Sequence, residues 1–131
     1  MDISLVPEIE TDFDLMQAWR RYLHKHPEIA FQERETAAYI AKKLEDFGIE
    51  VTRGIGKTGL VGTLKCGSSE KSIGLRADMD ALPIAEANTF EHRSGKSGVM
   101  HACAHDGHMA MLLGAAKYLA SSRYFSVTVQ F

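Results

Sequence analysis

The chain has 131 residues, of which 45% are hydrophobic and 24% are charged, and its formal net charge is −2. This length suits one domain with a real core, and the composition is that of an ordinary globular protein. The acidic balance gives no electrostatic case for binding nucleic acid or anionic membranes, and no apolar run approaches the roughly 20 residues of a transmembrane helix.

Helical patterns open the chain. The first predicted helix runs from about Thr11 to Lys25 and ends where His26 precedes Pro27, because a residue before proline is pushed away from helical geometry. The second runs from about Glu33 to Phe47, and Gly48 supplies the left-handed residue that stops it. Both helices are amphipathic, so each predicts one buried face.

Strand patterns and a third helix follow. Short strands are predicted near 50–52, 60–65 and 72–76, separated by glycine- and serine-rich turns. A helix then carries His108, Leu112, Ala115 and Leu119 at helical spacing, and Ser126–Phe131 is expected to form a buried strand. This order predicts a layered α/β domain.

The two chain ends carry further expectations. MDISLVPEIE lacks the basic start and apolar middle of a signal peptide, and two cysteines, Cys66 and Cys103, are too few for a disulfide framework. We therefore expect a cytoplasmic location, where a thiol stays free to bind metal. The apolar strand at the end of the chain indicates a fragment. The alternative is a short domain whose last strand is a sheet edge.

One short stretch concentrates side chains that bind metal: His101-Ala-Cys103-Ala-His105-Asp106-Gly-His108. Imidazole, thiolate and carboxylate all bind borderline-soft divalent metals. An extended backbone would place His101, Cys103 and His105 on one face, and a helix starting at Gly107 would put His108 in its first turn. The alternative is a set of solvated or packed histidines, with Cys103 as a small buried hydrophobe. The clustering favours a metal site.

A pair of carboxylates lies upstream. Asp78 and Asp80 follow an apolar strand and precede Pro83, and they share a side if strand geometry persists. Such a pair can hold a metal, or one member can orient an imidazole ligand. Solvated turn aspartates are the alternative.

Four ordered motifs resemble the start of the metal-dependent amidohydrolases, which include hippurate hydrolases, N-acyl-amino-acid amidohydrolases and auxin-conjugate hydrolases. The motifs are Arg20-Arg-Tyr-Leu-His24-x-His-Pro27-Glu28, Phe31-x-Glu33-x-x-Thr36, Leu75-Arg-Ala-Asp-Met-Asp-Ala-Leu-Pro83 and Gly98-Val-Met-His-Ala-Cys-x-His-Asp-Gly-His108. The resemblance implies a zinc-exopeptidase-like α/β/α catalytic domain. Residues 1–131 would be its amino-terminal part, with the rest of that domain and a lid or dimerisation domain absent.

The resemblance also implies roles for residues. Cys103 and His105 match metal ligands, and Asp80 matches a catalytic-site aspartate that orients and polarises the metal site. His101 and His108 are interpreted as supporting or packing groups, and His24 as a packing or hydrogen-bonding group. Two divalent ions are expected in the full-length protein, zinc or manganese, with nickel and cobalt as further candidates.

The implied activity is hydrolysis of the amide bond in small N-acyl amino acids or similar conjugates. The general base, three further metal ligands and the lid, through which a homodimer would form, are expected outside this sequence, so the chain alone should be inactive. The alternative is a non-catalytic, metal- or partner-binding remnant. A nucleic-acid-binding zinc module is disfavoured by the charge and by the lack of paired C-x-x-C spacing.

Ala104 departs from the glycine that is usual in the resembling motif. If this position takes a positive φ, alanine would cost roughly 1 kcal/mol and shift the ligand geometry. If the backbone there is extended, the change is nearly neutral.

Overall fold

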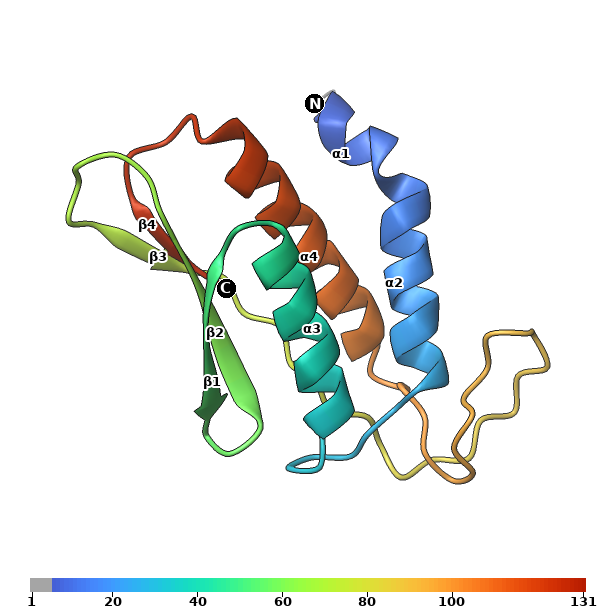
Figure 1. Ribbon diagram of the computed structural model, residues 1–131. Coiled ribbons are helices and arrows are strands. Elements are labelled where there is room, and N and C mark those ends of the chain that lie inside the picture. Colours follow the sequence, from blue (N-terminus) through green and yellow to red (C-terminus); the bar gives the residue numbers. More distant parts are fainter. Residues whose placement is uncertain (1–5) are drawn as a thin grey trace.

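A computed structural model describes residues 6–131 of the chain (Figure 1). Residues 1–5, half of the segment used above to argue against a signal peptide, lie outside the described part. The helices are α1 (Pro7–Thr11), α2 (Phe13–Lys25), α3 (Arg34–Asp46) and α4 (His105–Ser122).

The first two predicted helices are confirmed to within two residues. The predicted start at Thr11 differs because Asp12, with φ −87° and ψ 6°, breaks the chain into the short α1 and the longer α2. Helix α2 ends at Lys25, with His26 as its C-cap before the proline. Helix α3 ends at Asp46, with Phe47 as its C-cap before Gly48, whose φ is +79°.

Four strands form one sheet in the order β1-β2-β4-β3: β1 (Glu50–Ile55), β2 (Gly59–Lys65), β3 (Ser72–Gly74) and β4 (Thr128–Gln130). Strands β1 and β2 form an antiparallel hairpin. Strand β4 lies between β2, to which it is antiparallel, and β3, to which it is parallel. The alternative of a last strand at the sheet edge is therefore wrong, because β4 has a neighbour on both sides.

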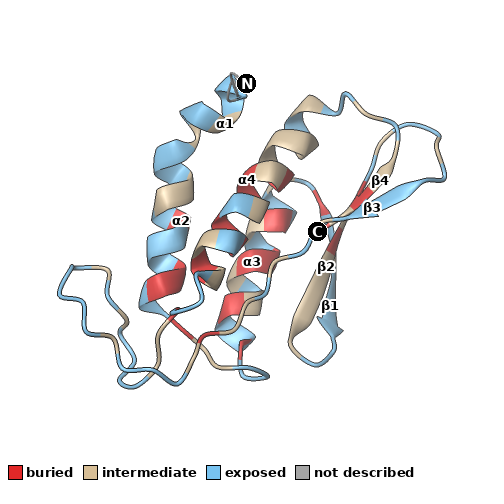
Figure 2. Cartoon of the chain, turned by 180° about the vertical axis from the view of Figure 1, so that it is seen from behind, coloured by how far each residue is buried: buried red, intermediate tan, exposed pale blue. Residues whose placement is uncertain are grey.

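Helices α2, α3 and α4 lie together on one side of the sheet (Figure 1). The buried core joins Trp19 and Leu23 of α2, Leu44 of α3, Leu113 of α4 and Val129 of β4, each no more than 3% exposed. Figure 2 shows this buried material running along the facing sides of the helices and the middle of the sheet. The mixed α/β class is thus confirmed, with the described residues supplying the sheet and one helical layer.

A long segment without helix or extended strand joins β3 to α4 (Figure 1). One isolated bridge, Ile29 with Ala81, links it to the loop between α2 and α3, and a second, Leu82 with Met100, joins two parts of the long segment itself. This arrangement carries the two sequence motifs that contain Asp80 and Cys103 to the amino-terminal end of α4.

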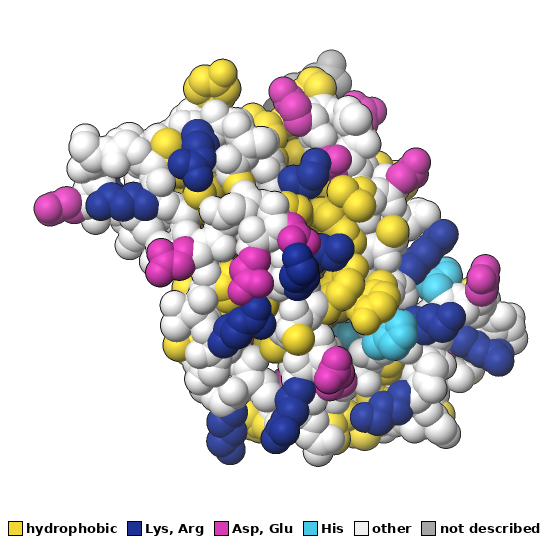
Figure 3. All heavy atoms as spheres, viewed as in Figure 1, with side chains coloured by type: hydrophobic (Ala, Val, Ile, Leu, Met, Phe, Trp, Pro, Cys, Tyr) yellow, Lys and Arg dark blue, Asp and Glu magenta, His cyan; other side chains and the backbone are white. Residues whose placement is uncertain are grey.

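The surface carries acidic and basic side chains interspersed with apolar ones on the face shown in Figure 3. Within residues 6–131, none of the helices combines the length and the apolar character needed to cross a bilayer.

Candidate metal centre

A tight turn, not an extended strand, leads into α4. Ala104 precedes the helix with φ 62° and ψ 23°, in the left-handed region, and its carbonyl accepts hydrogen bonds from the N–H groups of Gly107 and His108. The extended backbone that would have placed His101, Cys103 and His105 on one face does not occur here. Helix α4 also begins at His105, two residues earlier than the start considered at Gly107. The positive φ means that alanine at this position strains the backbone.

His105 is held by Asp80. Its Nδ1 lies 2.8 Å from the backbone carbonyl oxygen of Asp80 and 3.1 Å from the carboxylate Oδ1 of the same residue. Both partners are acceptors, so Nδ1 carries the proton and donates it. Nε2 then keeps the lone pair that binds metal, an arrangement common to metal-ligating histidines. The structure thus brings together two of the three predicted site residues, although they are distant in sequence.

Cys103 lies in the same turn and is exposed, so it is not the small buried hydrophobe of the alternative interpretation. The second cysteine, Cys66, is half-buried, and its thiol donates to the carbonyl of Arg123 at the far end of α4. An 18-residue helix is about 27 Å long, so the two thiols lie near opposite ends of α4. Both cysteines are free, as the sequence predicts.

The two aspartates of the upstream motif have different partners. Asp78 pairs with the guanidinium of Arg76 at 2.8 Å, and this hydrogen bond and charge hold the pKa of the Asp78 carboxyl below its usual value. Asp80 faces His105 instead. The pair therefore does not act as one binding unit, and the carboxylate that orients an imidazole is Asp80.

The other two histidines of the stretch differ in burial. His101 is 4% exposed, and neither ring nitrogen has a hydrogen-bond partner among the described residues. Burial lowers its pKa, which favours the neutral ring. His108 is exposed, and its ring centroid lies 5.8 Å from that of His105.

A buried polar network packs against the turn that precedes α4. His24 of α2 contacts Asp106 Oδ2 through Nδ1 and Glu86 Oε1 through Nε2, both at 2.9 Å, and Arg20 adds a 3.3 Å contact to Asp106. Glu86 also accepts from the backbone N–H of Ser94. The network ties α2, the long segment and the first turn of α4 to one another. It gives His24 the hydrogen-bonding role expected from the sequence.

Burial and hydrogen bonding act in opposite directions on this network. Burial disfavours the charged His24 ring, but the hydrogen bonds to Glu86 and Asp106 outweigh it and raise its pKa above the ordinary value. Burial likewise opposes ionisation of Glu86, yet hydrogen bonds from Asn88, His24 and the Ser94 N–H lower its pKa to about 2. Both shifts favour a positively charged His24 ring beside an ionised Glu86 carboxylate. Sequence reasoning missed Glu86 because no motif contains it.

The side chains at this turn are of the types that bind metal, but there are too few of them to complete a coordination shell. A thiol and an imidazole with a fixed proton are the ligands preferred by zinc-like ions. No group of three or more His, Cys, Asp or Glu side chains within residues 6–131 is arranged to hold an ion. The turn therefore offers part of a coordination shell.

Comparison with known proteins gives consistent similarities. Residues 74–131 match Peptidase family M20/M25/M40. The chain is 52% identical to the hippurate hydrolase of Campylobacter jejuni, over 93% of this chain and 32% of that protein. It is 50% identical to the N-acyl-L-amino acid amidohydrolase of Geobacillus stearothermophilus, over 91% of this chain and 31% of that protein.

A solved structure agrees with the sequence relatives. The YXEP protein of Bacillus subtilis, described as a dinuclear metal-binding peptidase of the M20 family, superimposes with a TM-score of 0.88 at 39% identity. The match covers 93% of this chain and 35% of that chain. The present chain thus spans about a third of the length of the relatives it matches.

Proposed function

We propose that this chain, a member of the M20 peptidase family, supplies part of the metal centre of an amidohydrolase that cleaves the amide bond of N-acyl amino acids. Cys103 and His105 are the proposed ligands, and Asp80 is a positioning residue that acts through His105. The observation that carries the proposal is the double contact of His105 Nδ1 with Asp80, which reserves Nε2 for a metal. The names of the relatives supply the substrate class.

The chemistry divides between metal and protein. Two divalent ions, zinc or manganese with nickel and cobalt as further candidates, would lower the pKa of a bound water and polarise the amide carbonyl. Cys103 contributes a thiolate sulfur and His105 contributes Nε2. Asp80 keeps the proton on Nδ1 and makes Nε2 a stronger ligand for the metal. Ala104 sets the angle between the two ligands, because its left-handed backbone turns the chain between them.

The chain alone is expected to bind metal weakly and not to turn over substrate. Within residues 6–131, no group of three or more His, Cys, Asp or Glu side chains is arranged to hold an ion. For the full-length protein we propose a cytoplasmic enzyme whose further ligands, general base and lid or dimerisation domain are supplied by additional chain. The alternative is a metal- or partner-binding domain without turnover, which the incomplete donor set favours for the chain by itself.

Titration of the chain with Co²⁺ tests the ligand assignment. A thiolate bound to Co²⁺ gives a charge-transfer absorption, which Cys103→Ser should abolish and the matched control Cys66→Ser should retain. Asp80→Asn should weaken binding by about tenfold, the lower end for groups behind a ligand, because the Asp80 backbone carbonyl still accepts from Nδ1. Asp78→Asn should leave affinity unchanged. A band that persists in Cys103→Ser, or disappears equally in Cys66→Ser, would contradict the proposal.

A further inference from the structure

A hollow of about 520 Å³ lies between the first turns of α3 and the β1–β2 hairpin. This volume is within the range of sites that bind small molecules. Ala37 and Ala38 of α3 form part of one wall, and their short side chains leave space that longer ones would fill. The hairpin, from Arg53 to Leu60, forms the opposite wall. Helix and hairpin together therefore make a preformed cavity of ligand size.

Three cationic side chains line this hollow: Arg34 from α3, Arg53 from β1 and Lys57 from the hairpin turn. Arg53 donates to Glu45 at 2.6 Å, but both side chains are about half exposed, and exposed pairs of this kind hold weakly. Arg34 and Lys57 form no ion pair with any residue of the range 6–131. The hollow therefore gathers positive charge that the described part of the fold does not neutralise.

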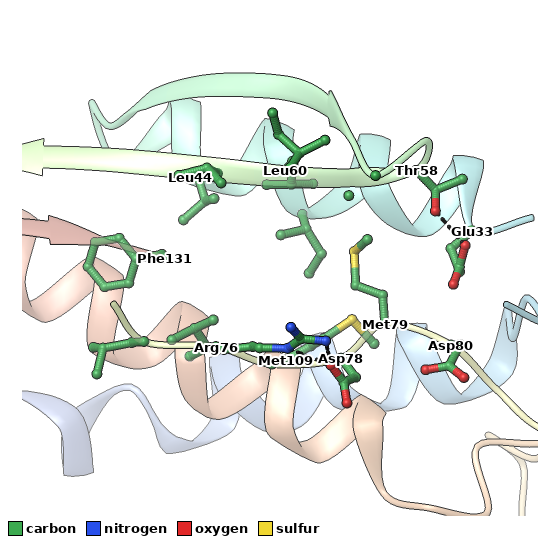
Figure 4. A pocket seen from close by; sticks show the side chains of 18 of the residues that line it. Glu33, Leu44, Thr58, Leu60, Arg76, Asp78, Met79, Asp80, Met109 and Phe131 are labelled. Carbon is green, nitrogen blue, oxygen red and sulfur yellow. Dashed lines mark hydrogen bonds and ion pairs between the residues drawn. The ribbon is translucent and has the colours of Figure 1, made fainter. Parts of the chain in front are cut away.

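The carboxylates at the start of α3 have other partners. Glu33 is 7% exposed and accepts from the hydroxyl of Thr58 at 2.7 Å (Figure 4). Glu28 accepts from the N–H of Thr36 at 2.6 Å and from its hydroxyl at 2.7 Å. Neither carboxylate lines the hollow. The three cations less the carboxylate of Glu45 leave a net charge of +2 at its walls.

Backbone strain is concentrated in the lining of the hollow. Phe31 and Lys57 are both left-handed, with φ of 62° and 85°. Bulky residues rarely adopt this conformation, and residues held in it cluster at ligand-binding sites. Phe31 is 64% exposed, and Nζ of Lys57 lies 4.8 Å from the centroid of its ring. The strained turns therefore hold an exposed aromatic ring beside a cation.

We propose that this hollow binds a phosphate monoester of a small organic molecule, with the phosphate held by Arg34, Arg53 and Lys57 and the organic part against Phe31. A phosphate monoester carries a charge of about −1.5 to −2 at pH 7, which matches the walls better than the single charge of a carboxylate. Guanidinium groups bind phosphate through paired hydrogen bonds, and an ammonium group adds a compact charge. Leu60 supplies apolar surface for the organic part. The lining contains neither Asp80 nor the proposed metal ligands, so the inference does not depend on the proposed function.

Titration of the chain with phenyl phosphate, followed by NMR of the backbone amides, tests the proposal. Saturable shifts should appear at Arg34 and Lys57, with a Kd below roughly 1 mM. Phenyl sulfate has the same ring and a similar shape but carries a single negative charge, so it should bind more weakly. Inorganic phosphate lacks the ring and should also bind more weakly than phenyl phosphate.

Substitutions in the lining test the individual contacts. Lys57→Gln and Arg34→Gln should each weaken binding of phenyl phosphate roughly tenfold, the size expected for one charge-assisted hydrogen bond. The matched control is Lys65→Gln, which removes an exposed lysine at the far end of β2 and should leave the affinity unchanged. Phe31→Gly permits the left-handed backbone without strain and should abolish the preference for phenyl phosphate over inorganic phosphate.

Several results would overturn the proposal. Equal weakening by Lys65→Gln and Lys57→Gln would assign binding to net charge rather than to this hollow. Shifts that do not saturate, or equal affinity for phenyl phosphate and phenyl sulfate, would exclude a phosphate site. A preference for phenyl phosphate that survives in Phe31→Gly would exclude the contact with the ring. The comparison of the three ligands needs no variant, so it decides the question even where a substitution perturbs the fold.

Discussion

Replacing Ala104 by glycine should stabilise the protein. The residue has φ 62° and ψ 23° and is exposed, so its methyl group adds little packing while the left-handed backbone is strained. Left-handed geometry costs an L-residue roughly 1–2 kcal/mol, and glycine avoids this cost.

The gain is partly offset in the unfolded state. Glycine has more unfolded conformations to lose than alanine, which costs about 0.4–1 kcal/mol. The net expectation for Ala104→Gly is a rise of about 0.5–1 kcal/mol in the free energy of unfolding. For a chain of this length, that change corresponds to a rise in Tm of about 2–4 °C.

The matched control is the same substitution in a helix. Ala38 is exposed within α3, and Ala38→Gly should lower the free energy of unfolding by about 1 kcal/mol. Both variants are measured by urea unfolding at one pH, with Tm from calorimetry. If Ala104→Gly destabilises the protein as Ala38→Gly does, the residue is not left-handed, and the account of the turn before α4 is refuted.

Three further predictions concern the site. Zinc at saturating concentration should slow alkylation of Cys103 while leaving Cys66 unchanged, because a metal-bound thiolate is withdrawn from reaction; equal slowing of both thiols, read by mass spectrometry, would contradict direct ligation. The 131-residue chain should not hydrolyse hippurate or N-acetyl amino acids with added zinc, manganese or nickel, and turnover at a rate comparable to a full-length relative would show that the assignment of missing groups is wrong. Glu86, with its pKa lowered from 4.5 to about 2, contributes stability that is present above pH 4.5 and lost as the pH falls toward 2. Urea unfolding of Glu86→Gln should therefore show a smaller decline across that window than the parent chain, and an unchanged decline would exclude Glu86 as its source.

Local signals in the sequence were sufficient to predict where the helices and most of the strands lie. The proline after His26 and the glycine after Phe47 act on the residues beside them, and the structure ends α2 and α3 there. The turn before α4 was harder, because Ala104 is an ordinary helix former held in a left-handed conformation by its surroundings. No local preference predicts that conformation for alanine.

The candidate site was predicted in its residue types but not in its contacts. Histidine, cysteine and aspartate in short motifs indicated metal chemistry, and the link from Asp80 to His105 was one of several open options. The partners of His24 depend on how α2 and the long segment pack against α4. Glu86 contacts His24 only because of that packing, so the order of residues along the chain could not predict its role.

The position of β4 has a consequence for how the chain folds during synthesis. Strand β4 is made after β1, β2 and β3, yet among the described residues β2 and β3 have no shared neighbour until it arrives. The β1–β2 hairpin and the early helices can form first. The other edge of β2 then has unpaired backbone groups while the following residues emerge from the ribosome. Long-range closure of this kind is slow, and open edges invite pairing with other nascent chains. Chaperone dependence during translation should therefore concentrate on the interval between the emergence of Lys65 and that of Gln130.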